Sequence, residues 1–312
     1  GYQPLIKGEV YYECGDFSKA VPDLAAAVEE ATQAGCPGAL VPAMVTIAKI
    51  KRACGNLTGA LEMVEQCEKT VAAYHKSHWV YMLEAFKTRL CIDADNTEAV
   101  DRWMTQSKLG VYHEITRTRE FELIVFARAL IKKQRYQDAD ILLNRLLSVS
   151  EGLRRNHSIV EILNLLAITA MKNLNEDDAF FYIERSLSVG MEGGYVRSFA
   201  DELSPMVSLL ELFIRKNKKR NKQTKYARNL LIKTQKAARD YMYSAHFPKT
   251  ESTLTTTEKK VLQLIVKGYT NREIADELCI AIRTATNHTV SIYRKMGVKN
   301  RTQCAQKARE YP

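Results

Sequence analysis

The sequence lacks the features that mark membrane-spanning and exported proteins. No apolar stretch reaches the roughly 18 residues that could cross a bilayer. No basic segment followed by an apolar one opens the chain, as it would in a signal peptide. Hydrophobic residues make up 46% of the 312 positions, which suffices for a sizeable core and for two domains. We therefore expect a soluble, cytoplasmic protein with no membrane partner.

Disulfide frameworks, metal sites and catalytic groups are missing too. The seven cysteines are scattered, odd in number and never spaced as C-x-x-C, which is typical of reduced thiols. The six histidines form no cluster with metal-ligand spacing, and no nucleophile is paired with a general base. We predict no catalytic, cofactor-binding or metal-binding residue, and so a protein that is not an enzyme.

A phosphate loop of the form G-x-x-x-x-G-K-S/T is also absent from the chain. Nothing in it cradles nucleotide phosphates in the way that this motif does. We expect no ATP hydrolysis by these residues.

Acidic residues are missing from one long stretch. Residues 215–239 carry 11 Lys or Arg and no Asp or Glu, whereas residues 1–214 carry 23 basic and 29 acidic side chains. Residues 248–312 carry 12 basic and 6 acidic ones. A basic block of this kind would raise non-specific attraction to phosphate groups. A solvated linker is the alternative, and the sequence leaves both open.

The C-terminal segment contains explicit helix start and stop signals. Three pairs follow the capping-box pattern, in which a side chain and a backbone amide cap each other: Thr255 with Glu258, Thr270 with Glu273, and Asn300 with Gln303. Gly268 and Gly297 stand where helices should end. The pattern predicts helices at about 256–267, 271–279, 282–296 and 300–309.

The second and third of these helices are separated by a few residues only, which is the layout of a helix-turn-helix. With Ala285, His288, Ile292 and Met296 facing inward, the third helix turns a different set of side chains outward. These are the predicted base contacts: Arg283, Thr286, Asn287, Val290 and Arg294. Arginine pairs with guanine, asparagine with adenine, and valine or threonine contacts the thymine methyl group.

Basic and polar residues flank this helix and are the predicted phosphate contacts, which set affinity rather than sequence preference. They are Asn271, Arg272, Lys295, Lys299 and Arg301. The alternative is a small helical cap with a solvated basic face. The ordered combination of caps, turn and exposed side chains favours DNA.

The rest of the chain repeats itself. Alanines recur at Ala20, Ala60, Ala99, Ala139 and Ala179, at intervals of 39 or 40 residues. Such a period with a small residue predicts a solenoid of helix pairs whose helices or loops are longer than in the tetratricopeptide unit of about 34 residues. We expect the turn before each second helix to be built from Gly, Asn or Asp.

Solenoids expose a concave surface that binds peptides, proteins or small effectors. Aromatic side chains that are candidates to line this groove are Tyr11, Tyr12, Trp79, Tyr81, Trp103 and Tyr112. Each of them is also compatible with the ordinary core between helices.

The terminal segment resembles the DNA-binding domain of LuxR-type transcription regulators. The elements that carry the resemblance are Leu254, Thr255 and Glu258; Val261, Leu262 and Leu264; Gly268; Asn271, Arg272, Glu273, Ile274 and Ala275; Thr284 and His288; Ile292, Lys295, Met296, Gly297 and Val298; and Arg301. The resemblance implies a four-helix domain that reads the major groove of promoter DNA.

The departures from this family fall in the reading helix. Ala281 replaces the usual serine N-cap, a loss of about 1 kcal/mol of local helix stability. Thr286 replaces a lysine that approaches DNA in the family, Ala285 is smaller than the usual valine, and Val290 stands at a position that is sometimes basic. Losing cations lowers salt-dependent affinity.

Residues 126–210 extend the resemblance to the large ATP-dependent regulators of the MalT-like family, in which an NTPase module and a winged-helix region precede the solenoid. The residues that carry it are Ala139, Leu142 and Leu143; Glu161, Ile162 and Leu163; and Glu192, Gly194, Tyr195, Val196, Arg197, Phe199, Asp201 and Glu202. The resemblance implies an inducer on the solenoid, self-association and activation of transcription with RNA polymerase. Because the chain begins Gly1-Tyr2 without methionine, we expect an upstream ATP-binding module in the natural protein.

Together these patterns predict an all-α, two-domain transcription regulator. A solenoid sensor is expected over residues 1–243, with a basic connector at about 215–224, a linker over 244–252 and the helix-turn-helix domain over 253–312. A protein-interaction scaffold whose helix-turn-helix has lost specific DNA binding is the alternative.

Overall fold

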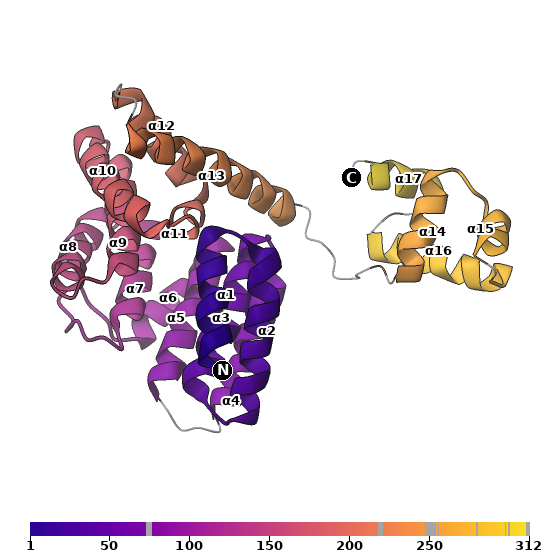
Figure 1. The fold of residues 1–312 in the computed structure, drawn as a ribbon, viewed down its shortest axis with the longest axis horizontal. Coiled ribbons are helices and arrows are strands. Elements are labelled where there is room, and N and C mark those ends of the chain that lie inside the picture. The colour runs from indigo at the N-terminus through magenta and orange to yellow at the C-terminus, as the bar shows by residue number, and fades with distance from the viewer. Residues whose placement is uncertain are drawn as a thin grey trace. The chain divides into compact units, whose positions relative to one another are not determined.

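The computed structural model describes residues 1–72, 77–217, 221–246, 254, 256–278, 280–296, 298 and 300–309. In these ranges it contains α-helices and no strand (Figure 1), which confirms the all-α prediction. The chain divides into two compact units, unit 1 over Gly1–His246 and unit 2 over Phe247–Pro312. No helix of the described ranges combines the length and apolar character that a membrane crossing needs.

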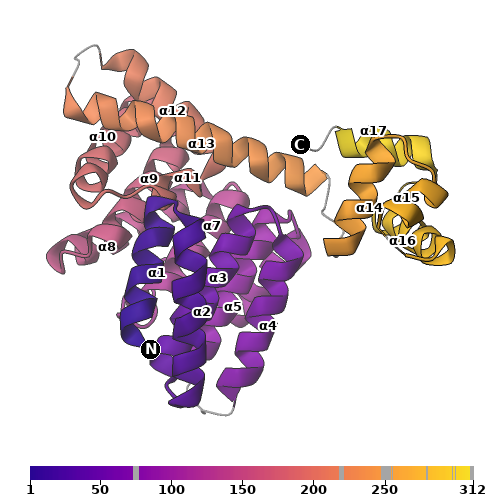
Figure 2. The same cartoon turned by 45° about the vertical axis from the view of Figure 1, so that its right-hand side comes forward.

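Unit 1 is a stack of helix pairs followed by three further helices. Its elements are α1 (Tyr2–Cys14), α2 (Phe17–Gln33), α3 (Pro37–Ala53), α4 (Leu57–Ala72), α5 (Ser77–Asp93), α6 (Thr97–Gln106), α7 (Glu120–Lys132), α8 (Tyr136–Gly152), α9 (Asn156–Lys172), α10 (Glu176–Gly193), α11 (Arg197–Ala200), α12 (Leu203–Lys216) and α13 (Lys222–His246). Most helices pack on their neighbours in the chain, and the short α11 packs on α1, α9, α12 and α13 (Figure 2).

The first helices of successive pairs form one layer of this stack. Helix α1 contacts α3, α3 contacts α5, α5 contacts α7 and α7 contacts α9. The short helix α11 then returns to α1. The solenoid therefore closes on itself, so that its last turn meets its first helix.

The alanine period has the packing role that the sequence predicts. Ala20, Ala60, Ala139 and Ala179 are all fully buried in the unit, and Ala99 is half-buried. A methyl group at this position lets neighbouring helices approach closely, and a larger side chain would force them apart.

The turns inside the helix pairs share one backbone conformation. One residue in each turn is left-handed, with φ between +57° and +80°. It is Gly15 directly after α1, and Gly55, Asp95, Gln134 and Leu174 two positions after the end of α3, α5, α7 and α9. The expectation of Gly, Asn or Asp in every turn is wrong for the turn at Gln134, whereas the turn at Leu174 contains Asn173 and Asn175. These turns close by hydrogen bonds onto carbonyls of the preceding helix, and this packing holds two residue types that rarely adopt positive φ.

The side chain after the turn caps the second helix in most pairs. Asp16, Asn96 and Asn175 accept a hydrogen bond from the amide three residues later, and Asn56 accepts one from Gly59 at 2.7 Å. Arg135 offers no such acceptor in the fourth pair. These caps satisfy backbone amides that the helix itself leaves unpaired.

The apolar core of unit 1 is divided into two clusters. One contains buried residues of α1 to α5, such as Leu24, Leu40 and Leu83. The other runs from α5 to α13 and is centred on residues such as Leu142 and Phe213. Phe121 packs against both clusters.

The expected connector at about 215–224 and the expected linker over 244–252 are partly helical in the structure. Residues 222–224, placed in a connector, and residues 244–246, placed in a linker, belong to α13, and Arg215 and Lys216 belong to α12. Thr224, Leu230 and Thr234 of α13 are buried. Contacts with α10, α11 and α12 keep this sequence helical despite its charge.

Unit 2 contains α14 (Thr256–Val266), α15 (Asn271–Glu277), α16 (Ile282–Met296) and α17 (Arg301–Arg309). These bounds confirm the four predicted helices. The core consists of Val261, Ile265, Ile274, Ala285 and Ile292 with their neighbours. Thr270 and Glu273 form both hydrogen bonds of a capping box, and Gly268 has φ +91° at the end of α14. The predicted signals at Thr255 and Gly297 lie outside the described residues.

We predict that Leu174→Gly stabilises unit 1 by about 0.5–1 kcal/mol. Leu174 is 91% exposed and left-handed, so glycine relieves backbone strain and removes no packing. The matched control is Leu153→Gly, at an exposed position with negative φ at the end of α8, where we expect no gain. Both tryptophans, Trp79 and Trp103, lie in unit 1, so urea unfolding followed by tryptophan fluorescence measures this unit. Equal effects of the two substitutions would contradict the strain argument.

Candidate functional site

Helix α16 is held against its neighbours by its buried face. Ala285 and Ile292 are fully buried and Thr289 is 4% exposed. The Thr289 hydroxyl lies 3.1 Å from Asn271 Oδ1 of α15. The Ser291 hydroxyl donates to Glu258 Oε1 of α14 at 2.7 Å. The orientation of α16 about its own axis is therefore set by polar contacts as well as by apolar packing.

Arg301 joins three segments of unit 2. Its guanidinium donates to Asn271 Oδ1 at 3.2 Å and to the carbonyl oxygen of Tyr269. The first turn of α17 is thereby tied to the start of α15. Asn271 receives contacts from both α16 and α17, so it lies at the centre of this junction.

The outward face of α16 carries most of the residues predicted to contact bases. Arg283, Thr286 and Asn287 are exposed, and Val290 is 60% exposed. The Arg294 side chain lies outside the described residues. The Thr286 hydroxyl donates to the carbonyl of Ile282 at 2.9 Å and lies 3.4 Å from Asn271 Nδ2. The four described residues share one face, opposite Ala285 and Ile292.

The residues predicted to contact phosphate fall into three groups. Arg272 is exposed. Asn271 and Arg301 are half-buried in the junction described above. The side chain of Lys295 and the whole of Lys299 lie outside the described residues. Ala281, at the start of α16, is exposed and accepts from the amides of Thr284 and Ala285 through its carbonyl alone.

Unit 1 contains a second candidate site, a buried cluster of charged groups where the first helices of the pairs meet α11. Arg52 Nε donates to Asp93 Oδ2 at 2.5 Å. Arg128 binds both oxygens of Glu202 at 2.6 and 2.7 Å and Glu161 Oε1 at 2.8 Å. We name this the arginine cluster, and it consists of Arg52, Arg89, Arg128, Arg197, Asp93, Glu161, Asp201 and Glu202.

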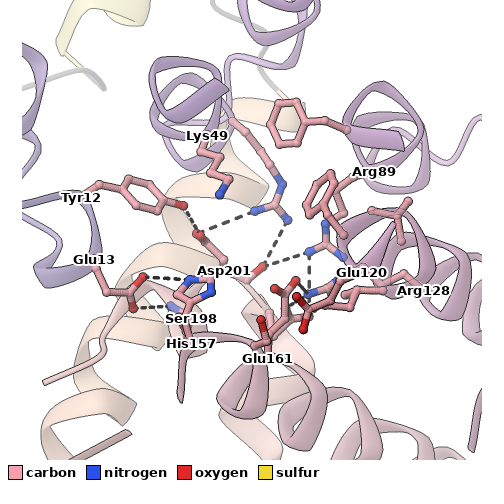
Figure 3. Close-up of a pocket in the computed structure, with 17 residues that line it drawn as sticks. Tyr12, Glu13, Lys49, Arg89, Glu120, Arg128, His157, Glu161, Ser198 and Asp201 are labelled. Atoms are coloured by element: carbon pink, nitrogen blue, oxygen red, sulfur yellow. Dashed lines mark hydrogen bonds and ion pairs between the residues drawn. The ribbon is translucent and has the colours of Figure 1, made fainter. Parts of the chain in front are cut away.

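Asp201 is the meeting point of this cluster (Figure 3). Its carboxylate accepts from Tyr12 and Arg197, and its carbonyl accepts from Arg52 at 3.2 Å and Arg89 at 3.5 Å. Burial acts to raise the pKa of this carboxyl, but Arg197 and Arg52 outweigh it and keep the pKa below its ordinary value. Asp201 therefore stays ionised although it is enclosed.

Glu13 binds the segment around α11 from the other side. Its Oε1 accepts from the amides of Val196 at 3.1 Å and Ser198 at 2.9 Å, and His157 Nε2 lies 3.8 Å from Oε2 (Figure 3). Burial raises the pKa of Glu13 above its ordinary value. By contrast, burial of Glu161 is outweighed by Arg128, which lowers that pKa to about 2.

Two cavities flank the arginine cluster. One of about 160 Å³ is lined by Tyr12, Glu13, Phe86, Phe121, His157 and Ser198, among others. The Ser198 hydroxyl there is buried, with no partner in the part of the chain that the structure describes. The other cavity, of about 520 Å³, shares Arg52, Arg89, Arg128, Asp201 and Glu202 with the first.

The larger cavity reaches the helix that precedes unit 2. Its lining includes Ala238, Tyr241 and Met242 of α13. The Tyr241 hydroxyl donates to the carbonyl of Asp93 at 3.4 Å. A molecule held in this cavity would therefore touch both the arginine cluster and α13.

The structure does not bring the six predicted groove aromatics together. Tyr12 lines the smaller cavity. Trp103 lies in the core beside Phe126, and Tyr11 and Trp79 pack against the first apolar cluster. Tyr81 lies under Arg119 and is 43% exposed, and Tyr112 lies beside Arg145 and is 77% exposed.

Sequence reasoning missed the charged residues that line the cavities. One signal for them existed, because Arg52, Arg89 and Arg128 fall near the repeat period on the first helices of three successive pairs. A long cation repeated among apolar residues on the inner layer indicates a shared polar site, since charges are buried only when paired.

Two protein families match the chain, one within unit 1 and one within unit 2. The family described as the MalT-like TPR region matches residues 3–216, and the luxR family of bacterial regulatory proteins matches residues 252–308. An HTH-type transcriptional regulator MalT of Serratia proteamaculans is 26% identical over 289 residues, which cover 85% of this chain. A protein of the same description from Yersinia enterocolitica is 26% identical over 287 residues. The chain spans 31% of the length of either relative.

We predict that Arg128→Ala destabilises unit 1 by about 3–5 kcal/mol, because it removes the ion-pair partner of Glu161 and leaves Glu202 with the more distant Arg89 at 3.9 Å. The control is Arg185→Ala, which breaks an ion pair with Glu151 whose side chains are 37% and 43% exposed, at a cost of about 1 kcal/mol or less. Urea unfolding followed by tryptophan fluorescence gives both values. A loss at Arg128 no larger than that at Arg185 would show that the cluster does not hold the unit closed.

Proposed function

The chain belongs to the family of bacterial transcription regulators in which a MalT-like TPR region precedes a luxR-family domain, and from this premise we propose that unit 2 binds promoter DNA with the exposed face of α16. The observation that carries the proposal is the common orientation of Arg283, Thr286 and Asn287, which are exposed opposite a buried face. A helix of this kind fits the major groove. We propose that ligand binding to unit 1 controls this interaction.

Each proposed base contact has a chemical counterpart in the groove. Arg283 and Arg294 match guanine, which offers two acceptors, and Asn287 matches adenine, which offers an acceptor and a donor. The methyl groups of Thr286 and Val290 match the thymine methyl group. The Thr286 hydroxyl is already bonded to its own helix, which leaves its methyl group as the part available to a base.

Arg272, Lys295 and Lys299 supply charge for the sugar–phosphate backbone. We assign Asn271 and Arg301 a double part, because they hold α15, α16 and α17 together at the edge where backbone contacts are expected. A guanidinium has five N–H donors, more than the contacts to Tyr269 and Asn271 use.

A scaffold without specific DNA binding is the second candidate function. It is favoured by Ala281, which provides no side-chain cap for α16, and by Thr286, which provides no cation. Both departures weaken binding without removing the exposed Arg283 and Asn287. A salt titration against upstream DNA of the protein's own operon separates the candidates, since a scaffold would show no sequence preference even at low salt.

We predict that Asn287→Ala and Arg272→Ala change DNA binding in different ways. Asn287→Ala relaxes the preference at one base pair, at a cost of about 1–3 kcal/mol for the preferred site. Arg272→Ala weakens all duplexes alike and reduces the slope of log K against log salt by about 1. Selection from a random duplex pool and anisotropy titrations measure the two effects, and Arg102→Ala, an exposed arginine of unit 1, is the control. Identical effects of both substitutions on every sequence would refute the division of roles.

The effector site that we propose is the larger cavity beside the arginine cluster. Its volume of about 520 Å³ lies within the range of small-molecule sites, and guanidinium and carboxylate groups line it. A polar molecule with both hydrogen-bond donors and acceptors fits this lining. Its contact with Tyr241 and Met242 would link occupancy to α13.

A cavity-blocking variant tests this assignment. Ser204, an exposed residue on the rim, lines the cavity, and Ser208, one turn further along α12, is also exposed. Sugars, amino acids, organic acids and nucleosides are screened by thermal shift on the wild-type chain. We expect any stabilising compound to bind Ser208→Trp normally and Ser204→Trp at least about tenfold more weakly, a loss of about 1.4 kcal/mol. A compound that binds Ser204→Trp and Ser208→Trp equally well would not bind in the larger cavity, and the assignment would be wrong.

The remaining proposals follow from the family and concern the whole protein. We propose that it acts in the cytoplasm as an activator, that it self-associates as a dimer or larger assembly when it engages RNA polymerase, and that any ATP chemistry belongs to segments other than these 312 residues.

A further inference from the structure

Helix α13 presents a continuous basic face to solvent. Its members are Lys222, Lys225, Arg228, Lys233, Lys236 and Arg239, all of them exposed. At 100° per residue, they lie on one side of the helix. We name this set the α13 basic face. None of the six forms an ion pair with another residue of the described ranges.

The opposite face of α13 fixes the direction in which these charges point. Thr224, Ala227, Leu230 and Thr234 are 3%, 0%, 1% and 0% exposed. They pack against α10, α11 and α12, and Phe199 contacts Tyr226 edge to face. Rolling the helix would expose this apolar surface to water. The α13 basic face is therefore a fixed surface of unit 1.

The α13 basic face differs in charge from the rest of unit 1. Asp240 is the one acidic residue of the α13 sequence, whereas residues 1–214 carry six more acidic than basic side chains. A polyanion is attracted to the α13 basic face, whereas the net negative charge of residues 1–214 disfavours it.

The dimensions of the face match duplex DNA. From Lys222 to Arg239 the helix rises by about 26 Å, at about 1.5 Å per residue. A duplex carries one phosphate charge per roughly 1.7 Å of its axis, or about 15 charges over that length. The phosphates along that length therefore outnumber the six cations on this side of the helix. No base recognition is needed for such contacts.

A membrane surface is the less suitable polyanion. Amphipathic helices that lie on bilayers insert an apolar face between the headgroups. The apolar face of α13 is already buried within unit 1, and Ile232 is a single large apolar residue among the exposed charges.

We propose that the α13 basic face is a second DNA-binding surface, which contacts the phosphate backbone independently of sequence. It adds salt-dependent affinity to the sequence readout of α16 and so compensates for the cations missing at Thr286 and Val290. This inference rests on the proposed function in one respect only, that duplex DNA is the partner.

The test replaces four cations of the face in the full chain, Lys225→Gln, Lys233→Gln, Lys236→Gln and Arg239→Gln. Its matched control makes the same change in charge at exposed positions elsewhere in unit 1, Lys7→Gln, Lys69→Gln, Arg102→Gln and Lys108→Gln. Anisotropy titrations use a labelled duplex of arbitrary sequence and about 40 base pairs, long enough for both surfaces. Circular dichroism verifies that helix content is retained.

We expect the basic-face variant to bind this duplex at least about tenfold more weakly near 0.1 M salt, with a slope of log K against log salt smaller by about 3.6. The control variant should stay within about twofold of the wild type, since no phosphate contact is removed. If both variants lose the same affinity, the effect is one of net charge and the proposal is overturned.

Two further measurements separate this proposal from its alternatives. The double variant Arg283→Ala/Asn287→Ala should lose sequence preference and keep its binding to arbitrary duplex, whereas the basic-face variant should keep its preference. If the wild type shows no sequence preference, the role of α16 fails while the basic face is still tested by the arbitrary duplex. Vesicles of phosphatidylcholine with phosphatidylserine complete the set. Vesicle binding that depends on the face, together with unchanged DNA binding, would overturn the proposal in favour of a membrane.

Discussion

Burial of charge at the arginine cluster is the constraint on which unit 1 depends. Its apolar core is divided into two clusters, and hydrogen bonds between Tyr12 and Asp201, and between Glu13 and the amides of Val196 and Ser198, join the two ends of the stack. Each enclosed guanidinium has carboxylate or carbonyl partners. Because an unpaired charge in this position is costly, the helices that supply these groups are held in one relative arrangement.

The arginine cluster is also suited to binding a polar effector. A hydrophobic core resists a polar ligand, whereas guanidinium and carboxylate groups can exchange a partner within the protein for a partner on a ligand. Arg52 and Arg89 donate to the carbonyl of Asp201, and Tyr241 of α13 donates to that of Asp93. Through Tyr241, the cluster is connected to α13, the helix that precedes unit 2 in the chain and carries the proposed backbone-binding face. Helix α13 would then both contact the bound effector and contribute to the affinity for DNA.

Unit 2 shows which features local sequence patterns can predict and which they cannot. The caps at Thr270 and Asn300, the left-handed Gly268 and the exposed face of α16 were all predictable, because they depend on residues three or four positions apart. The contacts of Asn271 with Thr289 and Arg301 were not, since they join residues 18 and 30 positions apart. Asn271 and Arg301, which were predicted to contact phosphate, therefore also hold the helices of unit 2 together, a role that no local pattern reveals.

For unit 1 the sequence by itself determined the helical class, the pairing of helices at a period of 39 or 40 residues and the burial of the small residue at four of the five repeats. These features repeat, and a repeat needs only short-range information. Tertiary structure alone decided that the stack closes, that the aromatic residues disperse into the core and onto the surface, and that three arginines meet carboxylates from distant helices. Tyr12 and Asp201 are 189 positions apart. Whether a charge at such a distance finds its partner depends on the accumulated rotation of every helix between them, which no local pattern contains.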